Sequence, residues 1–219
     1  EAATGLAALG LCGAQMDRFA LAKLCQKAEH DYAGVPCGIM DQAAVLCCEA
    51  GNLLLLDCQS ETFVQTPLAD GTWSLLIINS GVSHELAGGE YAQRRDACEQ
   101  AARHLRVPAL RHIAPEKLKS ALALPGLTEE MRRCVRHIVT ENDRTHRCVA
   151  ALKADDFPEA GSQLNASHVS LRDDYRVSCA ELDLIAEAAQ REFAVAGCRM
   201  TGGGFGGSCV ALVRKDNAA

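Results

Sequence analysis

Helical spacing of apolar residues, or a composition that favours helices, marks several segments of the chain. These segments are 2–11, 17–33, 90–105, 127–152 and 178–193. Asp17 is a good N-cap for the second segment, and Gly34 followed by Pro36 is expected to end it. Segment 127–152 is rich in Arg and Glu, which predicts a solvated helix, and Ser178 with Glu181 predicts a capping box.

Short apolar runs predict strands between these helices. Leu53–Cys58 and Ser74–Ile78 are typical of buried strands, and the alternating Thr62–Thr66 is expected to pair with the first of them as a hairpin. Asn79–Gly81 is expected to be a loop, and Cys209–Val213 a last strand. Because strands and helices do not alternate regularly, the pattern favours the α+β class.

Composition narrows the classes of function. The chain has 219 residues, 48% of them hydrophobic, and a net charge of −6, with no basic cluster interleaved with aromatic residues, so nucleic-acid binding is not expected. No signal peptide and no long apolar span are found, so no membrane association and a cytoplasmic location are expected. The twelve cysteines include no C-x-x-C pair, which predicts reduced core-filling thiols rather than a metal site.

A glycine-rich segment, Thr201–Gly207, is the first candidate for chemistry. Glycine lets backbone N–H groups converge on an anion, because no Cβ blocks a close approach. The segment does not fit the Walker pattern, and a predicted strand rather than a helix follows it, so it is not a dinucleotide fingerprint either. By itself it is either an anion-binding turn or a flexible turn before a strand.

Asp41 is the second candidate, because it lies just after Gly38 in a segment with few other charges. A carboxylate there could accept a proton from a substrate hydroxyl, or it could merely cap the helix that follows. Tyr91 is either half-buried or a ligand contact, and Arg94-Arg95 either contact phosphate or are surface charge. For the adjacent acids of Arg172–Tyr175, a local cap or salt bridge is expected.

Taken together, these segments resemble a known family. Gly38–Gln42 and Met200–Gly207 are similar to the aspartate loop and the third conserved motif of galactokinases, which are GHMP kinases. Other matching segments follow in the family's order: Gln26–His30, Leu55–Cys58, Glu90-Tyr91 with Arg94-Arg95, and Ser170–Tyr175. The resemblance runs over nearly the whole chain. One departure is Ser208, which intervenes before Cys209.

The resemblance implies a site and a reaction, the ATP-dependent phosphorylation of the C1 hydroxyl of galactose. Asp41 would orient or deprotonate that hydroxyl, and Gly38 and Tyr91 would line the sugar pocket. The residues expected near the transferred phosphate are Thr201, Gly202, Gly203, Gly204, Gly206 and Gly207. ATP and Mg²⁺ are the implied cofactors, galactose and ATP the implied partners, and the full-length enzyme is expected to be monomeric.

The resemblance also implies a two-domain fold of which only part is present. Residues 1–51 would be the remnant of an N-terminal nucleotide-binding domain that exposes apolar surface, and residues 52–219 the C-terminal GHMP kinase domain. The family's upstream sugar segment and ATP phosphate loop, with most Mg²⁺ ligands, are not among the 219 residues, so the chain alone is expected to be inactive. Two alternatives stay open: a kinase for N-acetylgalactosamine or another sugar, and a non-catalytic sugar sensor.

Overall fold

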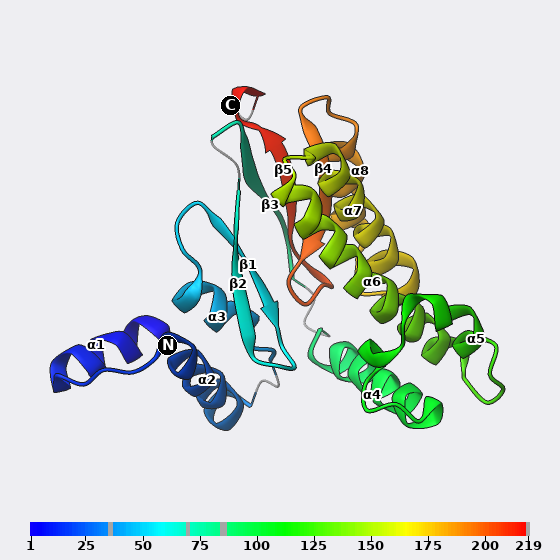
Figure 1. Ribbon diagram of the computed structural model, residues 1–219, viewed down its shortest axis with the longest axis horizontal. Helices are drawn as coiled ribbons and strands as arrows, with labels where there is room; N and C mark the ends of the chain where they lie inside the picture. The colour runs from blue at the N-terminus through cyan, green and yellow to red at the C-terminus, as the bar shows by residue number, and fades with distance from the viewer. Residues whose placement is uncertain (35–36, 69–70, 84–86, 218–219) are drawn as a thin grey trace. The chain divides into compact units, whose positions relative to one another are not determined.

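The computed structural model describes residues 1–34, 37–68, 71–83 and 87–217 (Figure 1). The chain divides into two compact units, Glu1–Leu68 and Ala69–Ala219, and each is described by itself. None of the helices in the described residues is long and apolar enough to cross a membrane.

The first unit contains three helices, a π-helical turn and a hairpin. Its elements are α1 (Ala2–Cys12), α2 (Arg18–Ala28), the π-helical turn η1 (Glu29–Ala33), α3 (Met40–Cys47), β1 (Asn52–Asp57) and β2 (Thr62–Pro67). As predicted, the side chain of Asp17 caps α2 by accepting the N–H of Ala20 at 2.9 Å. Gly34 ends the helical segment in the left-handed conformation, at φ 67°.

The core of the first unit lies between α2, α3 and the hairpin. Its buried residues are Leu21, Ala22, Cys25, Leu46 and Cys47, with Leu54 of β1 packed against them. The predicted hairpin is confirmed, because β1 and β2 pair antiparallel from Asn52↔Pro67 to Asp57↔Thr62. Strand β1 is half-buried along its length, not fully buried as its apolar run suggested. Helix α1 has no buried residue, and Leu11 is 90% exposed, so apolar surface is exposed within residues 1–51, as expected.

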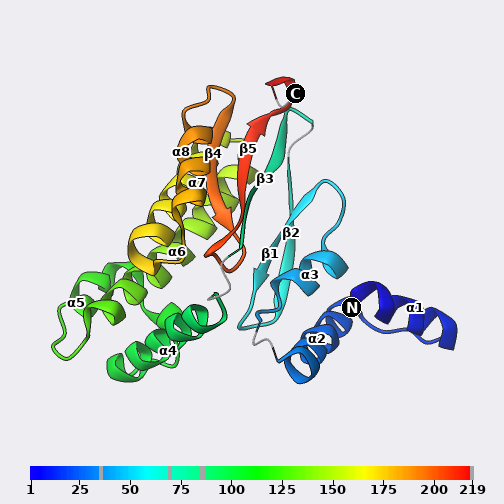
Figure 2. The ribbon, with the colours of Figure 1, turned by 180° about the vertical axis from the view of Figure 1, so that it is seen from behind.

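The second unit is an antiparallel sheet in the order β3-β5-β4, accompanied by helices. Figures 1 and 2 show α6, α7 and α8 gathered beside this sheet. The strands are β3 (Trp73–Ser83), β4 (Val195–Thr201) and β5 (Gly206–Arg214). The helices are α4 (Ala87–Leu105), α5 (Leu118–Leu122), α6 (Glu129–Lys153), α7 (Phe157–Ser170) and α8 (Ala180–Gln190). Short turns are η2 (Leu110–His112), η3 (Pro115–Lys117), η4 (Leu171–Tyr175) and η5 (Lys215–Asn217).

Two clusters of buried apolar residues hold this unit together. One joins α8 to β4 and β5 and includes Leu182, Met200 and Ala211, all 0% exposed. The other joins α4 to α6 and includes Ala101 and Val135, both 0% exposed. Five of the twelve cysteines are buried and four are partly buried, which agrees with the prediction that most of them fill space in the core.

Several predictions about the strands of the second unit were wrong in detail. Asn79–Gly81 is not a loop, because β3 continues through it to Ser83, with a shift in its pairing to β5 between Asn79 and Ser83. Gly81 has φ 68°, a conformation that glycine reaches without steric cost, and this lets the strand bend there. The middle of β3 is also more exposed than an apolar run suggests, with Ile77 60% exposed.

The helices also differ from the expectation. Helix α6 is not solvated all round, since it buries one face, including Cys134, Val135 and Val139. The expected capping box at Ser178 is absent: Cys179 precedes α8, and the Ser178 hydroxyl donates to Asp183 at 2.6 Å. That helix ends at Gln190 rather than near Phe193, and α7 was not predicted at all.

Candidate functional site

Asp41 lies in the first turn of α3, where its carboxylate is exposed. It is not the N-cap: Ile39 holds that position, and no side chain caps the helix. Among the described residues, Asp41 makes no hydrogen bond and no ion pair. A negative charge in the first turn is favoured by the helix dipole. The carboxylate is therefore placed at a helix start and open to a ligand, which does not support the capping interpretation.

The loop before Asp41 is held by side chains of α2 and η1. The carbonyl oxygen of Cys37 accepts hydrogen bonds from Gln26 Nε2 at 3.1 Å and pairs with His30 Nε2 at 2.8 Å. The Cys37 thiol donates to Glu29 Oε2 at 3.2 Å, and the same oxygen accepts from Gln42 Nε2 at 2.7 Å. These contacts fix both ends of the segment that contains Gly38 and Asp41.

Two features of this network follow from its environment. Burial, and then the hydrogen bond to Glu29 and its charge, raise the pKa of the Cys37 thiol, which keeps it protonated as a donor. Gly38 is exposed, and a Cβ built on it would meet nothing within 4 Å. The backbone of Gly38 is thus open to an approaching ligand on the side a Cβ would occupy.

Sequence patterns did not identify this network as the anchor of the loop. The sequence marks Gln26–His30 only as a segment that matches the family, and three of its four polar side chains, Gln26, Glu29 and His30, contact Cys37 or Gln42. The signal in the sequence was the unusual run of polar residues at the end of a helix whose earlier part follows an apolar stripe.

The glycine-rich segment Thr201–Gly207 contains the end of β4, the turn that follows it and the start of β5, and the two strands are antiparallel. Four of its glycines have positive φ: Gly202 (82°), Gly204 (89°), Gly206 (128°) and Gly207 (87°). A Cβ on Gly204 would lie 2.1 Å from the carbonyl oxygen of Val177, so this position requires glycine for packing. Cβ atoms on Gly202, Gly203 and Gly207 would meet nothing within 4 Å.

The turn is fixed at its edges and open in its middle. The N–H of Phe205 donates to the carbonyl of Val177 at 2.7 Å, and the hydroxyl of Ser80 donates to the carbonyl of Gly207 at 2.8 Å. Within the described part of the chain, the N–H groups of Gly202, Gly203 and Gly204 have no protein acceptor. Neighbouring N–H groups without acceptors can bind an anion. The turn is therefore held in place by hydrogen bonds and still has backbone donors available for a ligand.

The remaining candidate residues are a tyrosine and several charged side chains that form ion pairs. Tyr91 belongs to α4, and its side chain is outside the described residues. Arg95 pairs with Glu99 at 3.2 Å on the same helix. Arg172 pairs with the adjacent Asp173 at 2.8 Å, which is the local salt bridge that was expected. Asp174 instead pairs with Arg136 of α6 at 2.8 Å, a contact between residues far apart in the sequence.

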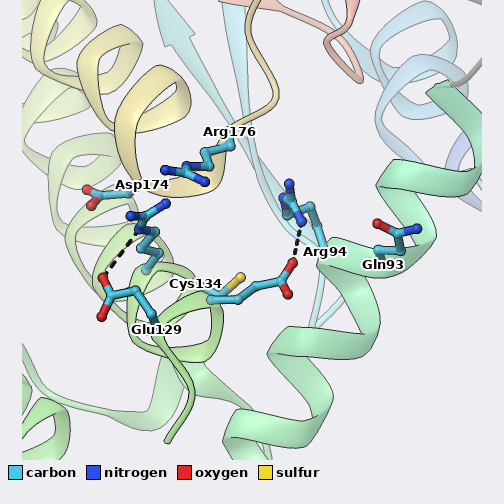
Figure 3. A pocket seen from close by; sticks show the side chains of 8 residues that line it. Gln93, Arg94, Glu129, Cys134, Asp174 and Arg176 are labelled. Atoms are coloured by element: carbon cyan, nitrogen blue, oxygen red, sulfur yellow. Dashed lines mark hydrogen bonds and ion pairs between the residues drawn. The ribbon is translucent and has the colours of Figure 1, made fainter.

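A pocket of about 440 Å³ lies between α4, α6 and η4 (Figure 3). Most of the charges around it neutralise one another. Arg94 pairs with Glu130 and donates to the carbonyl of Tyr175 at 2.7 Å, and Arg133 pairs with Glu129 at 3.3 Å. Arg94 and Arg133 are therefore held in structural pairs, and Arg94 links α4, α6 and η4.

The described residues contain no multi-ligand metal cluster. No group of three or more His, Cys, Asp or Glu side chains among them could hold a metal ion. Glu29 already accepts two hydrogen bonds on one oxygen. Magnesium commonly takes only one or two carboxylates and completes its shell with water and phosphate oxygens.

Comparison with known families places both units in one family. The sequence pattern described as "GHMP kinases N terminal domain" matches residues 1–49, and the pattern "GHMP kinases C terminal" matches residues 148–219. The chain belongs to the GHMP kinases. The α+β fold expected from the sequence is the fold of this family.

Among GHMP kinases, the chain is similar to galactokinases. It is 49% identical to the galactokinase of Streptomyces coelicolor over 210 residues, which cover 95% of this chain and 53% of that protein. It is 47% identical to the human galactokinase over 199 residues, covering 91% of this chain and 50% of the other. The crystal structure of Lactococcus lactis galactokinase complexed with galactose matches 99% of this chain with a TM-score of 0.93 at 35% identity, and the match covers 57% of that structure.

The chain thus spans about half the length of the curated relatives it matches. Its aspartate loop and its glycine-rich turn lie in different units of this GHMP kinase fold, and each has the local geometry described above.

Proposed function

We propose that the protein to which these residues belong phosphorylates the C1 hydroxyl of galactose with ATP. The proposal is supported by relatives at 47–49% identity that are galactokinases, and by the likeness to a galactokinase structure solved with galactose. Asp41 carries the proposal, because it is an exposed carboxylate without a partner among the described residues, in the first turn of α3 and directly after a loop that other side chains hold in place.

Asp41 acts on the sugar in this proposal. Its carboxylate orients the C1 hydroxyl and accepts its proton as the oxygen attacks the γ-phosphorus atom of ATP, whose bond to the bridging oxygen breaks so that ADP leaves. General-base assistance of this kind is typically worth about 10²–10⁴-fold in rate. Gly38 lets the backbone approach the sugar, and Tyr91 lines the pocket. Phosphoryl transfer depends mainly on positioning and on neutralising charge, so an aspartate held in a defined place suits this reaction.

The glycine-rich turn acts on the phosphate. Within Thr201–Gly207, Gly202 and Gly203 present backbone N–H groups with open space where a Cβ would lie, and such donors stabilise the oxygens of a phosphoryl group in transfer. Galactose, ATP and Mg²⁺ as ligands, a monomeric full-length enzyme and a cytoplasmic location are parts of the same proposal.

The domain assignment also belongs to the proposal. We assign residues 1–51 to an N-terminal domain and 52–219 to a C-terminal domain, because the N-terminal family pattern stops at residue 49. The compact unit extends further, to Leu68, since β1 packs Leu54 against the core of α2 and α3. The hairpin of β1 and β2 therefore belongs to the C-terminal domain in this assignment, but to the first unit by compactness.

The substrate is tested with the full-length protein, by measuring ADP release with galactose and with N-acetylgalactosamine, and sugar binding by calorimetry. We expect turnover with galactose on the order of 1–10³ s⁻¹, the usual range for enzymes, and much less with the acetylated sugar. Preferred turnover of N-acetylgalactosamine would identify another sugar kinase. Binding of galactose without ADP release would identify a sugar sensor and overturn the proposal.

A further inference from the structure

β4 is an edge strand of the sheet in the second unit, and it leads directly into the glycine-rich turn. An edge strand leaves every second residue with its N–H and C=O pointing away from the sheet. In β4 these residues are Cys198 and Met200, which face Ala211 and Cys209 of β5. Met200 immediately precedes Thr201, so whatever holds the outward groups of Met200 also holds the start of the turn.

Side chains take up the outward groups of both residues. Cys198 donates its N–H to Asn165 Oδ1 at 2.9 Å, and its carbonyl accepts from Gln190 Nε2 at 2.9 Å. Met200 donates its N–H to His168 Nδ1 at 3.2 Å, and its carbonyl accepts from Arg199 Nε at 2.9 Å. Helices α7 and α8 thus supply three of the hydrogen bonds that a further strand would otherwise make, and Arg199 of β4 itself supplies the fourth.

His168 is itself held in one orientation and one protonation state. Its side chain is 2% exposed, and its Nε2 lies 3.2 Å from Asp183 Oδ1, without the alignment of a hydrogen bond. Asp183 accepts the hydroxyl of Ser178 at 2.6 Å. Because Nδ1 accepts the N–H of Met200, the proton of the neutral ring is on Nε2, facing Asp183. Burial lowers the pKa of His168, which keeps the ring neutral and Nδ1 available as an acceptor.

The carbonyl of Met200 is held by a second chain of contacts. Arg199, which donates to it, also pairs with Glu141 of α6 at 3.0 Å, and Glu141 accepts the hydroxyl of Ser167. The N–H of Met200 is therefore tied to His168 of α7, and its carbonyl is tied through Arg199 to Glu141 of α6. At the other end of the turn, Ser80 holds the carbonyl of Gly207.

We propose that His168 is a positioning residue for the glycine-rich turn: by accepting the N–H of Met200, it fixes where the backbone donors of residues 202–204 lie. The inference deepens the proposed function, in which those donors meet the transferred phosphate. His168 does not touch the substrate, and its effect passes through the backbone of Met200 and Thr201.

The test uses two variants that differ in the position of their polar atom. In His168→Asn, Oδ1 stands as many bonds from Cα as Nδ1 does in histidine, so it can still accept from Met200. In His168→Gln, the polar atoms stand where Nε2 stood, and the N–H of Met200 loses its acceptor. The control is His137→Gln, because His137 is also buried and bonds Ser170 at 3.0 Å, away from Met200.

The primary readout is the amide hydrogen exchange of residues 200–207 in the chain itself. We expect His168→Gln to speed the exchange of Met200 by at least about fivefold, while His168→Asn and His137→Gln leave it close to wild type. Exchange that is unchanged in His168→Gln, or equally fast in His168→Asn, would overturn the inference. Amide exchange in the core helix α6 reports global unfolding, so an increase counts as local only where it exceeds the increase seen in α6 of the same variant.

A second readout separates this inference from the proposed function. In the full-length enzyme, we expect His168→Gln to lower kcat more than it changes the KM for galactose, and His168→Asn to restore kcat. If exchange changes as expected but kcat does not, His168 positions the turn and the role of the turn at the phosphate is wrong. If exchange does not change, the inference fails whatever the kinase activity is.

Discussion

The aspartate loop and the glycine-rich turn are held in place by different means. The loop around Gly38 and Asp41 depends on Gln26 and His30, which bond the carbonyl of Cys37, and on Glu29. The carboxylate of Glu29 accepts from the Cys37 thiol and from Gln42. The glycine-rich turn depends on strand pairing, on a close backbone approach to Val177, and on the buried ring of His168. Substitutions around the loop should therefore disturb it locally, whereas substitutions at the turn should affect the stability of a whole unit.

The largest effect of this difference is expected at Gly204. In Gly204→Ala, the new Cβ would lie 2.1 Å from the carbonyl oxygen of Val177, in a residue with φ 89°. Both the clash with backbone and the left-handed conformation oppose alanine, so we expect a loss of at least about 3 kcal/mol in unfolding free energy. Denaturant unfolding measures this loss.

The matched control is Gly203→Ala, at a position with nothing within 4 Å of a Cβ and no positive φ. We expect this change to stay within about 1 kcal/mol of wild type. Equal unfolding free energies for the two variants would mean that the turn is not packed against Val177.

The second prediction concerns pH and the buried polar groups of the second unit. Burial lowers the pKa of His137 to about 4, against the opposing charges of Glu141 and Asp174. The unfolded chain therefore binds a proton at a pH where the folded chain does not. The stability that His137 contributes is complete above about pH 6.5 and is lost as the pH falls toward 4.

The variant His137→Asn isolates this contribution, because asparagine can keep the contact to Ser170 that His137 Nδ1 makes at 3.0 Å. Between pH 7.5 and pH 5, we expect the wild type to lose about 2 kcal/mol more unfolding free energy than His137→Asn. Parallel pH profiles for the two proteins would show that His137 is not buried as a neutral ring.

The smallest effect is expected in the first unit, at Glu29. Glu29→Ala removes the acceptor shared by the Cys37 thiol and Gln42. Since the network is only partly buried, we expect a loss of about 1 kcal/mol, which is a few degrees in Tm for a chain of this size. Amide exchange of residues 37–42 should rise while that of the core of α2 does not. A loss as large as that of Gly204→Ala would end the contrast between the two regions.

Local patterns predicted the parts of the fold that depend on near neighbours. The hairpin Asn52–Pro67, the cap at Asp17 and the turn at Gly34 follow from apolar runs and from residues with a strong local preference. Helix α7 was missed because polar residues take buried positions on it, among them Ser167 and His168, and they break the apolar stripe.

The candidate site was predicted as a set of residues rather than as a geometry. Asp41 and the glycines were identified by their resemblance to a family, while the groups that hold them were not. Glu29 and His168 act through contacts 8–32 residues away in the sequence, which no periodicity reveals. Gly204 packs against Val177, whereas Gly202 and Gly203 have open space around them. This difference likewise depends on where Val177 lies in the fold, which the sequence does not reveal.

The kcat of Asp41→Asn in the full-length enzyme, measured beside its thermal midpoint, tests the central claim most directly. Asparagine keeps the shape of the side chain but removes the proton acceptor, so we expect kcat to fall by at least about 100-fold with an unchanged midpoint. The control is Asp31→Asn, which breaks only an exposed pair with Lys27 and should leave kcat near wild type. A near-normal kcat for Asp41→Asn with an unchanged midpoint would contradict the assignment of Asp41 as the catalytic base.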